Sequence, residues 1–277
     1  MNITFSEFDR VYQSSVDEIW RHWSESMQHE IARHCFAWSP DRMNFREYLR
    51  LSSVRYFKAF KALIAASGTS VCDVGGFWGV WPITLKKFGF DVAMTETLRF
   101  YGDSFDPLFA EIRGRGIEIY DFDPFEPDSR LPRDFDFVSL MAIIEHYPHS
   151  LRNLAENVKR LISPEGSIFF EVPNIAYWPK RVSLLFGKSP LVELADVYRS
   201  EIPFIGHHHE FTIDEMRDLA RLAGLRIVGE EFYNYSTTGR NKMKLFVVHP
   251  VLSTATTLIK QTRECIAVVC QHPPSST

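Results

Sequence analysis

The stretch Val71-Cys72-Asp73-Val74-Gly75-Gly76-Phe77-Trp78-Gly79 places an acidic residue and three glycines at the end of a short apolar run. The run Ser70–Val74 has the composition of a buried strand, and the residues after Gly79 are compatible with a helix. Glycines at such a junction let the backbone turn sharply and approach a ligand, while the first turn of the helix offers free N–H groups. The stretch therefore predicts a ligand-binding turn between a strand and a helix.

The spacing within this stretch discriminates between two classes of cofactor. Dinucleotide-binding proteins carry Gly-x-Gly-x-x-Gly, which brings the pyrophosphate onto the helix N-terminus. Here the pattern is Asp73-x-Gly75-x-x-x-Gly79, and no glycine occupies the third fingerprint position. A cofactor with an amino-acid tail and no phosphate fits this loop better. A tight turn that binds no ligand is the alternative.

Short apolar runs recur along the chain in alternation with helix-compatible stretches. They are Ser70–Val74, Asp91–Thr95, Ile117–Tyr120, Phe135–Met141, Ser167–Val172, Arg226–Phe232 and Lys242–His249. This alternation predicts an α/β fold with a seven-stranded, mostly parallel sheet and helices on both faces. Thr212 followed by Glu215 is the signature of a capping box, so we expect a helix over Ile213–Ala223.

The segments around this alternation give the expected domain organisation. Residues 1–66 have a mostly helical pattern and form an N-terminal cap, and residues 67–250 form the ligand-binding domain. Residues 174–210 start no clear strand and are far longer than a usual connection, so we expect a helical insertion after strand five that acts as a substrate lid. Residues 251–277 are helix-compatible, which predicts a C-terminal helical tail.

Composition and charge argue against several classes of protein. The net charge is −4, whereas nucleic-acid-binding proteins usually carry a basic surface, so we expect no nucleic-acid partner. No apolar run is long enough to span a membrane, and the N-terminus does not resemble a signal peptide. The four cysteines lack disulfide-like spacing, which suits a reducing compartment. These features predict a cytoplasmic protein with no membrane partner.

Acidic residues accompany three successive strands at the edge where parallel strands end. Asp73 lies in the first strand, Glu96 directly follows the second, and Asp123 follows the third. A carboxylate at the position of Glu96 can accept both ribose hydroxyls of a nucleoside. Asp123 could bind an adenine amino group with Phe122 packed on the ring, and Asp121 is the rival for this role. The pattern predicts a cofactor that contains a nucleoside.

Over most of residues 45–249 the chain resembles class I S-adenosylmethionine (AdoMet)-dependent methyltransferases, which have a Rossmann-like fold. The resemblance is carried by the loop from Asp73 to Gly79, by Glu96 and Asp123, by Phe135-Asp136-Phe137-Val138 before Ile144-Glu145-His146, and by Ser163-Pro164-Glu165-Gly166-Ser167. One position departs from the family's Asp-x-Gly-x-Gly-x-Gly loop, because Phe77 stands where its middle glycine would be.

The resemblance implies AdoMet as the cofactor and assigns residues to it. Asp73 would lie near the amino group of the cofactor, and Gly75 and Gly79 would allow close backbone approach. Arg55 resembles an arginine that pairs with the cofactor carboxylate in some relatives, and a solvated helix arginine is the alternative. The residues assigned to cofactor binding are Arg55, Asp73, Gly75, Gly76, Gly79, Glu96, Phe122, Asp123 and Met141.

Two clusters that contain histidine are candidates for the part of the site where methyl transfer occurs. They are Glu145-His146, after the fourth strand, and the stretch from Gly206 to Thr212. A hydroxyl acceptor must lose its proton during methyl transfer, and histidine is the usual base near neutral pH. We expect His207, His146 and Glu145 to be catalytic. The adjacent residues His207, His208 and His209 cannot all point into one site. The residues expected to bind the acceptor are Tyr177, Trp178, His208 and His209.

The same clusters also resemble part of a metal site. Metal-dependent small-RNA 2′-O-methyltransferases carry Glu-x-x-Glu-His after strand four and a histidine three residues before a Glu-aromatic-Thr motif. Glu145, His146 and His207 match three of these four ligand positions, while Ala142 replaces the first glutamate. The missing carboxylate weakens a hard-cation site, since such ions take several oxygen ligands. A divalent metal is therefore an alternative to a metal-free site.

We expect an AdoMet-dependent methyltransferase that acts on an oxygen of a small molecule, a sugar or a glycan. A metal-assisted RNA 2′-O-methyltransferase is an alternative that the acidic charge opposes. A nucleotide-binding dehydrogenase or epimerase is opposed by the missing third glycine of the fingerprint. A catalytically inactive AdoMet-fold binding module is the last alternative, and Phe77 and Ala142 would be consistent with it.

Overall fold

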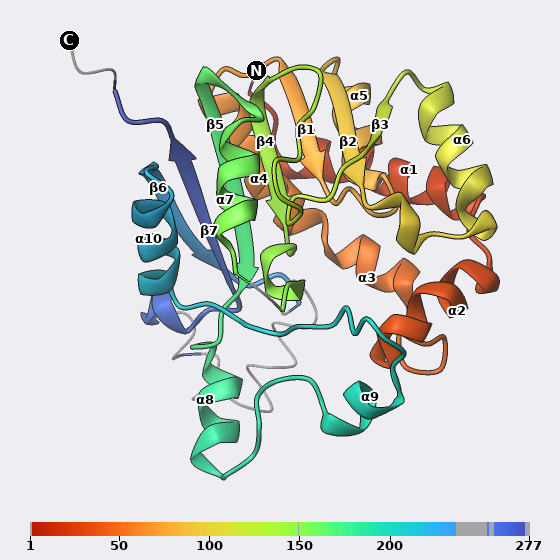
Figure 1. Cartoon of the computed structure of the whole chain (residues 1–277), viewed down its shortest axis with the longest axis vertical. Coiled ribbons are helices and arrows are strands. Elements are labelled where there is room, and N and C mark those ends of the chain that lie inside the picture. The colour runs from red at the N-terminus through yellow and green to blue at the C-terminus, as the bar shows by residue number, and fades with distance from the viewer. Residues whose placement is uncertain (1, 149, 237–253, 255–257, 275–277) are drawn as a thin grey trace.

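The computed structural model describes residues 2–148, 150–236, 254 and 258–274, and a twisted sheet lies at its centre (Figure 1). The strands are β1 (Ser70–Val74), β2 (Asp91–Glu96), β3 (Glu118–Asp121), β4 (Phe135–Met141), β5 (Ile162–Pro173), β6 (Arg226–Tyr233) and β7 (Cys265–Gln271). Their order is β3-β2-β1-β4-β5-β7-β6. Only β7 runs antiparallel to its neighbours, β5 and β6, so the predicted seven-stranded, mostly parallel sheet is confirmed.

The strand order reverses direction between β1 and β4. From β1 the chain proceeds outward through β2 to β3, and it then returns to place β4 on the other side of β1. In open α/β sheets, ligands bind outside the carboxyl ends of the strands at such a switch point. The topology therefore directs attention to the loops that follow β1 and β4.

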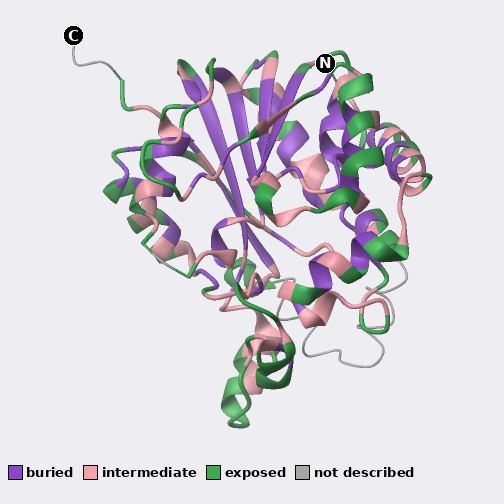
Figure 2. Ribbon diagram, turned by 45° about the vertical axis from the view of Figure 1, so that its right-hand side comes forward, coloured by how far each residue is buried: buried purple, intermediate pink, exposed green. Residues whose placement is uncertain are grey.

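Helices cover both faces of the sheet, as the sequence pattern predicts. They include α4 (Ser53–Ala65), α5 (Val80–Lys87), α6 (Asp106–Gly114), α7 (Arg152–Lys159) and α10 (Ile213–Leu222). Neighbouring strand residues face different cores: Val71 and Phe137 belong to one, and Cys72 and Val138 to the other. Both faces of the strands are therefore buried (Figure 2). Within the described part of the chain, no helix is long and apolar enough to cross a membrane.

The N-terminal helices form part of the first core and are more than a peripheral cap. They are α1 (Phe5–Trp20), α2 (Glu25–His34) and α3 (Phe45–Leu51), followed by α4. Phe8 of α1 is fully buried, and its ring centroid lies 5.2 Å from that of Phe60 and 6.2 Å from that of Trp81. Aromatic side chains from α1, α4 and α5 thus hold the N-terminal segment on the sheet domain.

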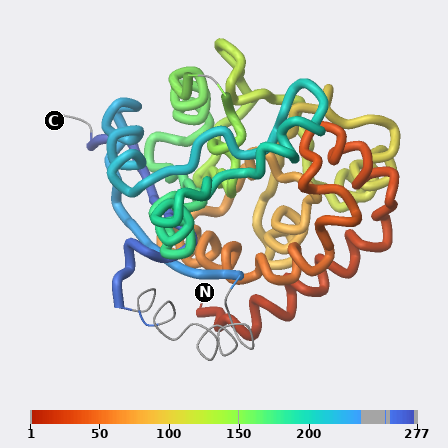
Figure 3. Tube along the Cα trace, turned by 90° about the horizontal axis from the view of Figure 1, so that it is seen from below, coloured from red at the N-terminus to blue at the C-terminus, as the bar shows by residue number. Residues whose placement is uncertain are grey.

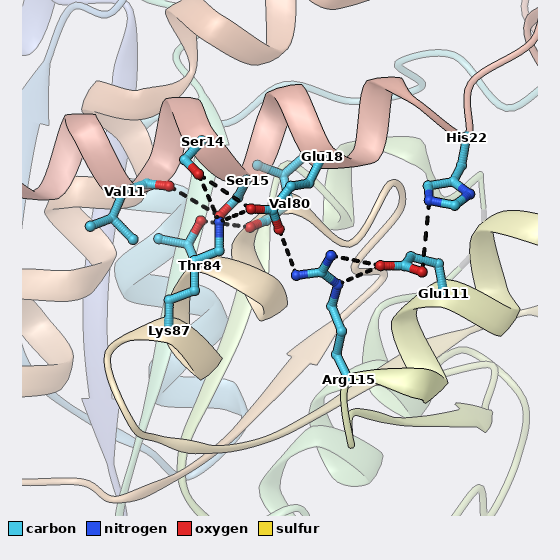
Figure 4. Close-up of polar contacts among 10 residues, drawn as sticks. All are labelled: Val11, Ser14, Ser15, Glu18, His22, Val80, Thr84, Lys87, Glu111 and Arg115. Carbon is cyan, nitrogen blue, oxygen red and sulfur yellow. Dashed lines mark hydrogen bonds and ion pairs between the residues drawn. The ribbon is translucent and has the colours of Figure 1, made fainter.

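A polar bridge supports the same contact (Figure 4). Glu18 of α1 accepts a hydrogen bond from Lys87 Nζ at 2.8 Å and another from Arg115 Nη1 at 2.5 Å. Arg115 also binds Glu111 of α6 through two hydrogen bonds. These groups are partly exposed to solvent, so the bridge orients α1 more than it stabilises it.

The predicted helical insertion after strand five is present. It contains α8 (Trp178–Leu185) and α9 (Leu194–Arg199), and its last part lies beside the N-terminal helices (Figures 1 and 3). The Ile205 N–H donates to the carbonyl of His34, and the Phe36 N–H donates to Ser200 Oγ, both at 2.9 Å. The insertion and the cap therefore meet along a hydrogen-bonded seam.

One secondary-structure prediction near the C-terminus is wrong. The predicted helical tail over residues 251–277 instead contains the strand β7, which lies between β5 and β6. A fully buried strand is a continuous apolar run, which periodicity does not distinguish from a buried helix. The predicted strand Lys242–His249 lies outside the described residues. The capping box of Thr212 and Glu215 is confirmed at the start of α10.

We predict that replacing Phe8 by Ala lowers the free energy of unfolding by about 3–5 kcal/mol, because it opens a cavity in the aromatic core. Urea unfolding followed by circular dichroism measures this loss. Phe5 is the control: it lies on the same helix but is 42% exposed, so Phe5→Ala should cost much less. A loss in Phe8→Ala as small as that expected for Phe5→Ala would show that Phe8 does not anchor α1 in the core.

Candidate active site

A cavity of about 540 Å³ lies at the carboxyl ends of the strands around the switch point. The loop after β1 and the end of β2 line one side of it, and the end of β5 together with the insertion lines another. Aromatic residues of the N-terminal segment, among them Trp38, Phe45 and Tyr48, complete the wall. The volume is within the range of small-molecule and cofactor sites, about 300–1,000 Å³.

The loop after β1 turns through three left-handed residues. Gly75 has a φ of +68°, Phe77 of +51° and Gly79 of +73°. A Cβ atom on Gly75 would lie 2.4 Å from Cδ1 of Ile143, so this position has no room for a side chain. Gly75 and Gly76 line the cavity, whereas Gly79 forms the turn into α5. Steric crowding and a positive φ therefore explain why glycine stands at Gly75 and Gly79.

Phe77 adopts the left-handed conformation in spite of its side chain. Its N–H donates to the carboxylate of Glu96, and its ring packs 5.9 Å from that of Phe45 and 6.1 Å from that of Trp38. These contacts offset the strain of a non-glycine residue at positive φ. The departure from the family's loop pattern is thus compensated by aromatic residues of the cap.

Asp73 lies behind the glycine loop and outside the cavity wall. Its Oδ1 accepts a hydrogen bond from Ser139 Oγ at 2.7 Å. Burial raises the pKa of Asp73 to about 8, partly opposed by this hydrogen bond. Since it is not among the residues that line the cavity, any contact with a ligand would pass through water or through a shift of the loop.

Glu96, at the end of β2, faces the cavity. It is buried, and it accepts hydrogen bonds from Tyr101 Oη at 2.7 Å and from the N–H of Phe77. Burial raises the pKa of Glu96 to about 7, although both hydrogen bonds favour its ionised form. A carboxylate still has further lone pairs for hydroxyl donors of a ligand.

The other residues assigned to the cofactor divide into two groups. Phe122 and Met141 line the cavity. Asp123 is not among the lining residues, and its carboxylate binds Arg99 at 2.8 Å and the N–H of Phe125 at 2.9 Å. Its rival Asp121 accepts a hydrogen bond from a backbone N–H instead, at 3.0 Å. Phe122 thus lines the cavity, as do Pro124 and Phe125 of the same loop, whereas the two carboxylates beside Phe122 have local partners.

Arg55 lines the cavity but is engaged with another side chain. Its guanidinium forms a buried ion pair with Glu171 of β5 and donates to Tyr48 Oη at 3.0 Å. It also lies over the ring of Tyr235, 4.9 Å from the centroid. The solvated alternative is therefore wrong, because Arg55 is only 5% exposed.

Glu145 lies at the centre of the reacting end. It belongs to a short 3-10 helix, η4 (Ile144–His146), and is fully buried. Neither carboxylate oxygen has a hydrogen-bond partner, and burial raises its pKa well above the ordinary value. A buried unpartnered carboxyl group is costly, so its presence indicates a site that receives a ligand.

Two histidines adjoin this carboxyl group. His207 Nε2 lies 4.0 Å from Glu145 Oε1, and the rings of His146 and His207 are 4.8 Å apart. His146 Nδ1 lies 2.6 Å from the carbonyl of Ile205, which can only accept, so this nitrogen carries the proton. Burial lowers the pKa of His146 to about 3, so this imidazole is neutral at pH 7. The structure thus brings the three predicted catalytic residues together.

Glu210 and Lys180 are part of this cluster, although neither is among the site residues assigned from the sequence. His207 Nδ1 lies 2.9 Å from Glu210 Oε1, and Lys180 of α8 pairs with the other oxygen of Glu210. Burial opposes ionisation of Glu210, but the hydrogen bonds from His207 and Lys180 outweigh it and lower its pKa. The spacing His207-x-x-Glu210 was the available signal.

The residues expected to bind the acceptor are only partly brought to the cavity. Tyr177 lines it, whereas Trp178, His208 and His209 are not among the lining residues. His208 Nε2 bonds to the carbonyl of Phe204 at 2.9 Å, and His209 Nε2 to Glu215 at 3.0 Å. The three adjacent histidines therefore have three different partners, and only His207 reaches the site.

Glu145, His146 and His207 also form a group that could hold a metal ion, with one ligand atom from each within 4.8 Å of the others. Imidazole and carboxylate ligands suit several divalent metals. Each imidazole has its Nδ1 at a hydrogen-bonding oxygen, which leaves Nε2 as the ligand atom, as is usual for metal-binding histidines. The donor set therefore fits a metal chemically.

Comparisons with known proteins place this geometry in a family. A family model described as a methyltransferase domain matches residues 19–230. A solved S-adenosylmethionine-dependent methyltransferase from Clostridium acetobutylicum has a TM-score of 0.52 at 9% identity, covering 78% of this chain and 90% of that one. The glycopeptide N-methyltransferase MtfA in complex with S-adenosyl-L-homocysteine also gives 0.52, at 13% identity, covering 80% and 90%.

The pyocyanin biosynthetic protein PhzM has a TM-score of 0.51 at 16% identity, covering 84% of this chain and 59% of that one. No curated protein matches the chain. At such identities the solved structures show the fold, while the family model spans more than half of the sequence. This match argues against the dehydrogenase and epimerase alternatives. The chain belongs to the methyltransferase-domain family and is a class I AdoMet-dependent methyltransferase.

Proposed function

We propose that this methyltransferase acts on an oxygen atom of a small molecule, a sugar or a glycan. The observation that carries the proposal is the single cavity that joins the glycine loop and Glu96 to the cluster of Glu145 and His207. The proposed cofactor and acceptor sides thus share one cavity. Transfer between two bound partners gains most of its rate from such proximity and alignment.

On the cofactor side, AdoMet supplies an electrophilic methyl group when it is bound. Gly75 and Gly76 allow the backbone to approach it, and Glu96 would accept its ribose hydroxyls. Phe122 and Met141 offer apolar surface for the adenine ring. These residues would bind and orient the cofactor, and they take no part in proton transfer.

On the acceptor side, His207 would take the hydroxyl proton. Because Glu210 only accepts when ionised, the 2.9 Å contact favours the tautomer with the proton on Nδ1 and leaves the lone pair of Nε2 available. The new carbon–oxygen bond forms as the sulfur–carbon bond breaks, and the acceptor proton passes to Nε2. Glu210 then stabilises the imidazolium, and Lys180 keeps Glu210 ionised.

Residues 174–210 would form the acceptor side and exclude water. Support comes from Tyr177 and Lys180, which line the cavity from this insertion, and from the seam that holds its last part on the cap. Excluding water favours transfer to the intended acceptor.

Cofactor binding is tested by calorimetry with AdoMet and S-adenosylhomocysteine. Glu96→Ala should weaken the binding of both ligands by roughly 1–3 kcal/mol, because the hydrogen bonds to this buried carboxylate are no longer formed. Asp121→Ala is the matched control, because the Asp121 carboxylate accepts a hydrogen bond from a backbone N–H and does not line the cavity. This variant should bind both ligands with wild-type affinity. Wild-type affinity in Glu96→Ala would remove Glu96 from the site.

The reaction itself is tested by incubating the protein and ¹³C-methyl AdoMet with a panel of hydroxylated small molecules and sugars. Mass spectrometry detects S-adenosylhomocysteine, and NMR of the product locates the methyl group. We expect an O-methyl product. Methyl transfer to nitrogen or carbon alone would contradict the proposal.

With the acceptor so found, His207→Ala should lower turnover roughly 10²- to 10⁴-fold with AdoMet affinity unchanged, as expected for loss of a general base. His209→Ala is the control, because its imidazole binds Glu215 outside the cavity. ¹⁵N NMR of the imidazoles should show His207 protonated on Nδ1 in the wild type and a mixture of tautomers in Glu210→Ala. Full turnover in His207→Ala would show that His207 is not catalytic.

A divalent metal held by Glu145, His146 and His207 is a second candidate for how the acceptor is activated. The observation that favours it is the unpartnered carboxylate of Glu145 beside two imidazoles. A metal there would lower the pKa of a bound hydroxyl and replace the need for a base. The net charge of −4 still does not favour RNA as the acceptor.

Titration with Mn²⁺, followed by electron paramagnetic resonance, distinguishes the two mechanisms. The metal version predicts binding that His207→Ala abolishes and His209→Ala retains, together with loss of turnover in EDTA. Full turnover in EDTA would contradict it. The base version would then account for the activity.

A further inference from the structure

Exposed apolar side chains are concentrated on one part of the insertion, residues 181–202, which we call the insertion tip. Large apolar residues there that are more than 70% exposed are Leu185, Phe186, Leu194, Tyr198 and Ile202. A small soluble domain normally buries such side chains or spreads them singly, and clustered ones mark a contact surface. The contact surface is separate from the cavity, because none of the five lines it.

The tip projects from the body at the end of the molecule opposite the two termini (Figures 1 and 2). Leu185 and Phe186 are at the end of α8, and Leu194 and Tyr198 are four residues apart on α9, which places them on one face of that helix. Hydrogen bonds hold the base of the tip on the N-terminal cap, including Phe36 N–H to Ser200 Oγ. The apolar groups are thus presented by an anchored segment.

The tip carries three basic and three acidic residues, and the acidic ones are paired with arginines of the N-terminal cap. Glu201 lies 2.8 Å from Arg33, and Arg42 is shared between Asp196 at 3.0 Å and Glu193 at 3.6 Å. The tip and these two arginines together hold five basic residues against three acidic ones, a net charge of +2. The basic residues have no such neutralisation: in the region that the structure describes, no acidic group lies within ion-pair distance of Arg181, Lys188 or Arg199. Exposed leucine and phenylalanine side chains are therefore flanked by unneutralised cations.

We propose that the insertion tip docks onto an anionic lipid surface. Apolar side chains that enter the interface, together with lysine and arginine at headgroup level, are the two components of peripheral membrane binding. A second copy of the chain fits less well, because a two-fold contact through this surface would bring together two copies of the same net positive surface. This proposal departs from the sequence-based expectation of no membrane partner, which rested on the lack of a spanning segment, because surface docking requires no such segment.

The docked orientation has a consequence for the site. Tyr177 and Lys180, just before the tip, line the cavity, so docking would bring the acceptor side close to the lipid. The proposal does not rest on the identity of the methyl acceptor.

Flotation of the full chain with lipid vesicles tests the proposal. The vesicles contain phosphatidylcholine with phosphatidylglycerol, and phosphatidylcholine alone serves for comparison. The wild type should float with the anionic vesicles at low salt and be released as salt is raised. The double variant Leu185→Glu, Phe186→Glu should lose at least tenfold in binding, and Lys188→Ala about fivefold, as expected for one cation at an anionic surface.

Leu222→Glu is the matched control, because Leu222 is 75% exposed at the end of α10 and outside the tip. It should bind vesicles as the wild type does. Circular dichroism and AdoMet affinity check that each variant is folded. Failure of the wild type to float would overturn the proposal, as would an equal loss in Leu222→Glu. A wild-type dimer in sedimentation that the double variant dissolves would assign the tip to a second copy instead.

Discussion

The turn between β1 and α5 imposes a backbone constraint on which both sides of the cavity depend. Gly75 contacts Ile143 of the loop after β4, and a Cβ on Gly79 would lie 2.5 Å from Cδ1 of Ile112 of α6. The left-handed conformation at Phe77 presents its N–H to Glu96. A change of path at this turn would thus move the end of β2, the loop after β4 and the aromatic cap together, because interiors are packed too densely to absorb it locally.

Buried carboxyl groups gather around this turn at a cost to stability. Burial raises the pKa of Asp73 to about 8 and that of Glu96 to about 7, so the folded chain holds more protons than the unfolded chain between the ordinary carboxyl pKa values and these raised ones. For such groups stability falls as pH rises through this range. A ligand that favours the ionised forms opposes this loss. The concentration of uncompensated acids is typical of a functional site and not of a core selected for stability.

The insertion connects three parts of the molecule that the sheet alone would leave separate. Lys180 of α8 reaches Glu210, which orients His207, and the segment after α9 binds the N-terminal cap. The cap in turn supplies Trp38, whose ring lies 5.8 Å from that of His146. The proposed reacting end is therefore built from the cap, the loop after β4 and the insertion, while the proposed cofactor side belongs mainly to the sheet.

The sequence by itself determined the features that depend on neighbouring residues. Strands Ser70–Val74 and Phe135–Met141 have the predicted bounds, the capping box at Thr212 starts a helix, and the glycine loop lies at the switch point. The sequence also selected Glu145, His146 and His207 as partners. It did so through the family resemblance, since spacing does not show that residues about sixty positions apart will meet.

The tertiary structure alone decided what depends on distant contacts. Arg55 pairs with Glu171, 116 positions away, and this ion pair takes it out of the solvent. His207 is hydrogen-bonded to Glu210, which pairs with Lys180, whereas the adjacent His208 and His209 bind other partners. The strand β7 was missed because its apolar run has the same pattern as a buried helix. Local pattern specifies an element and its faces, but which side chains meet is decided by packing between elements.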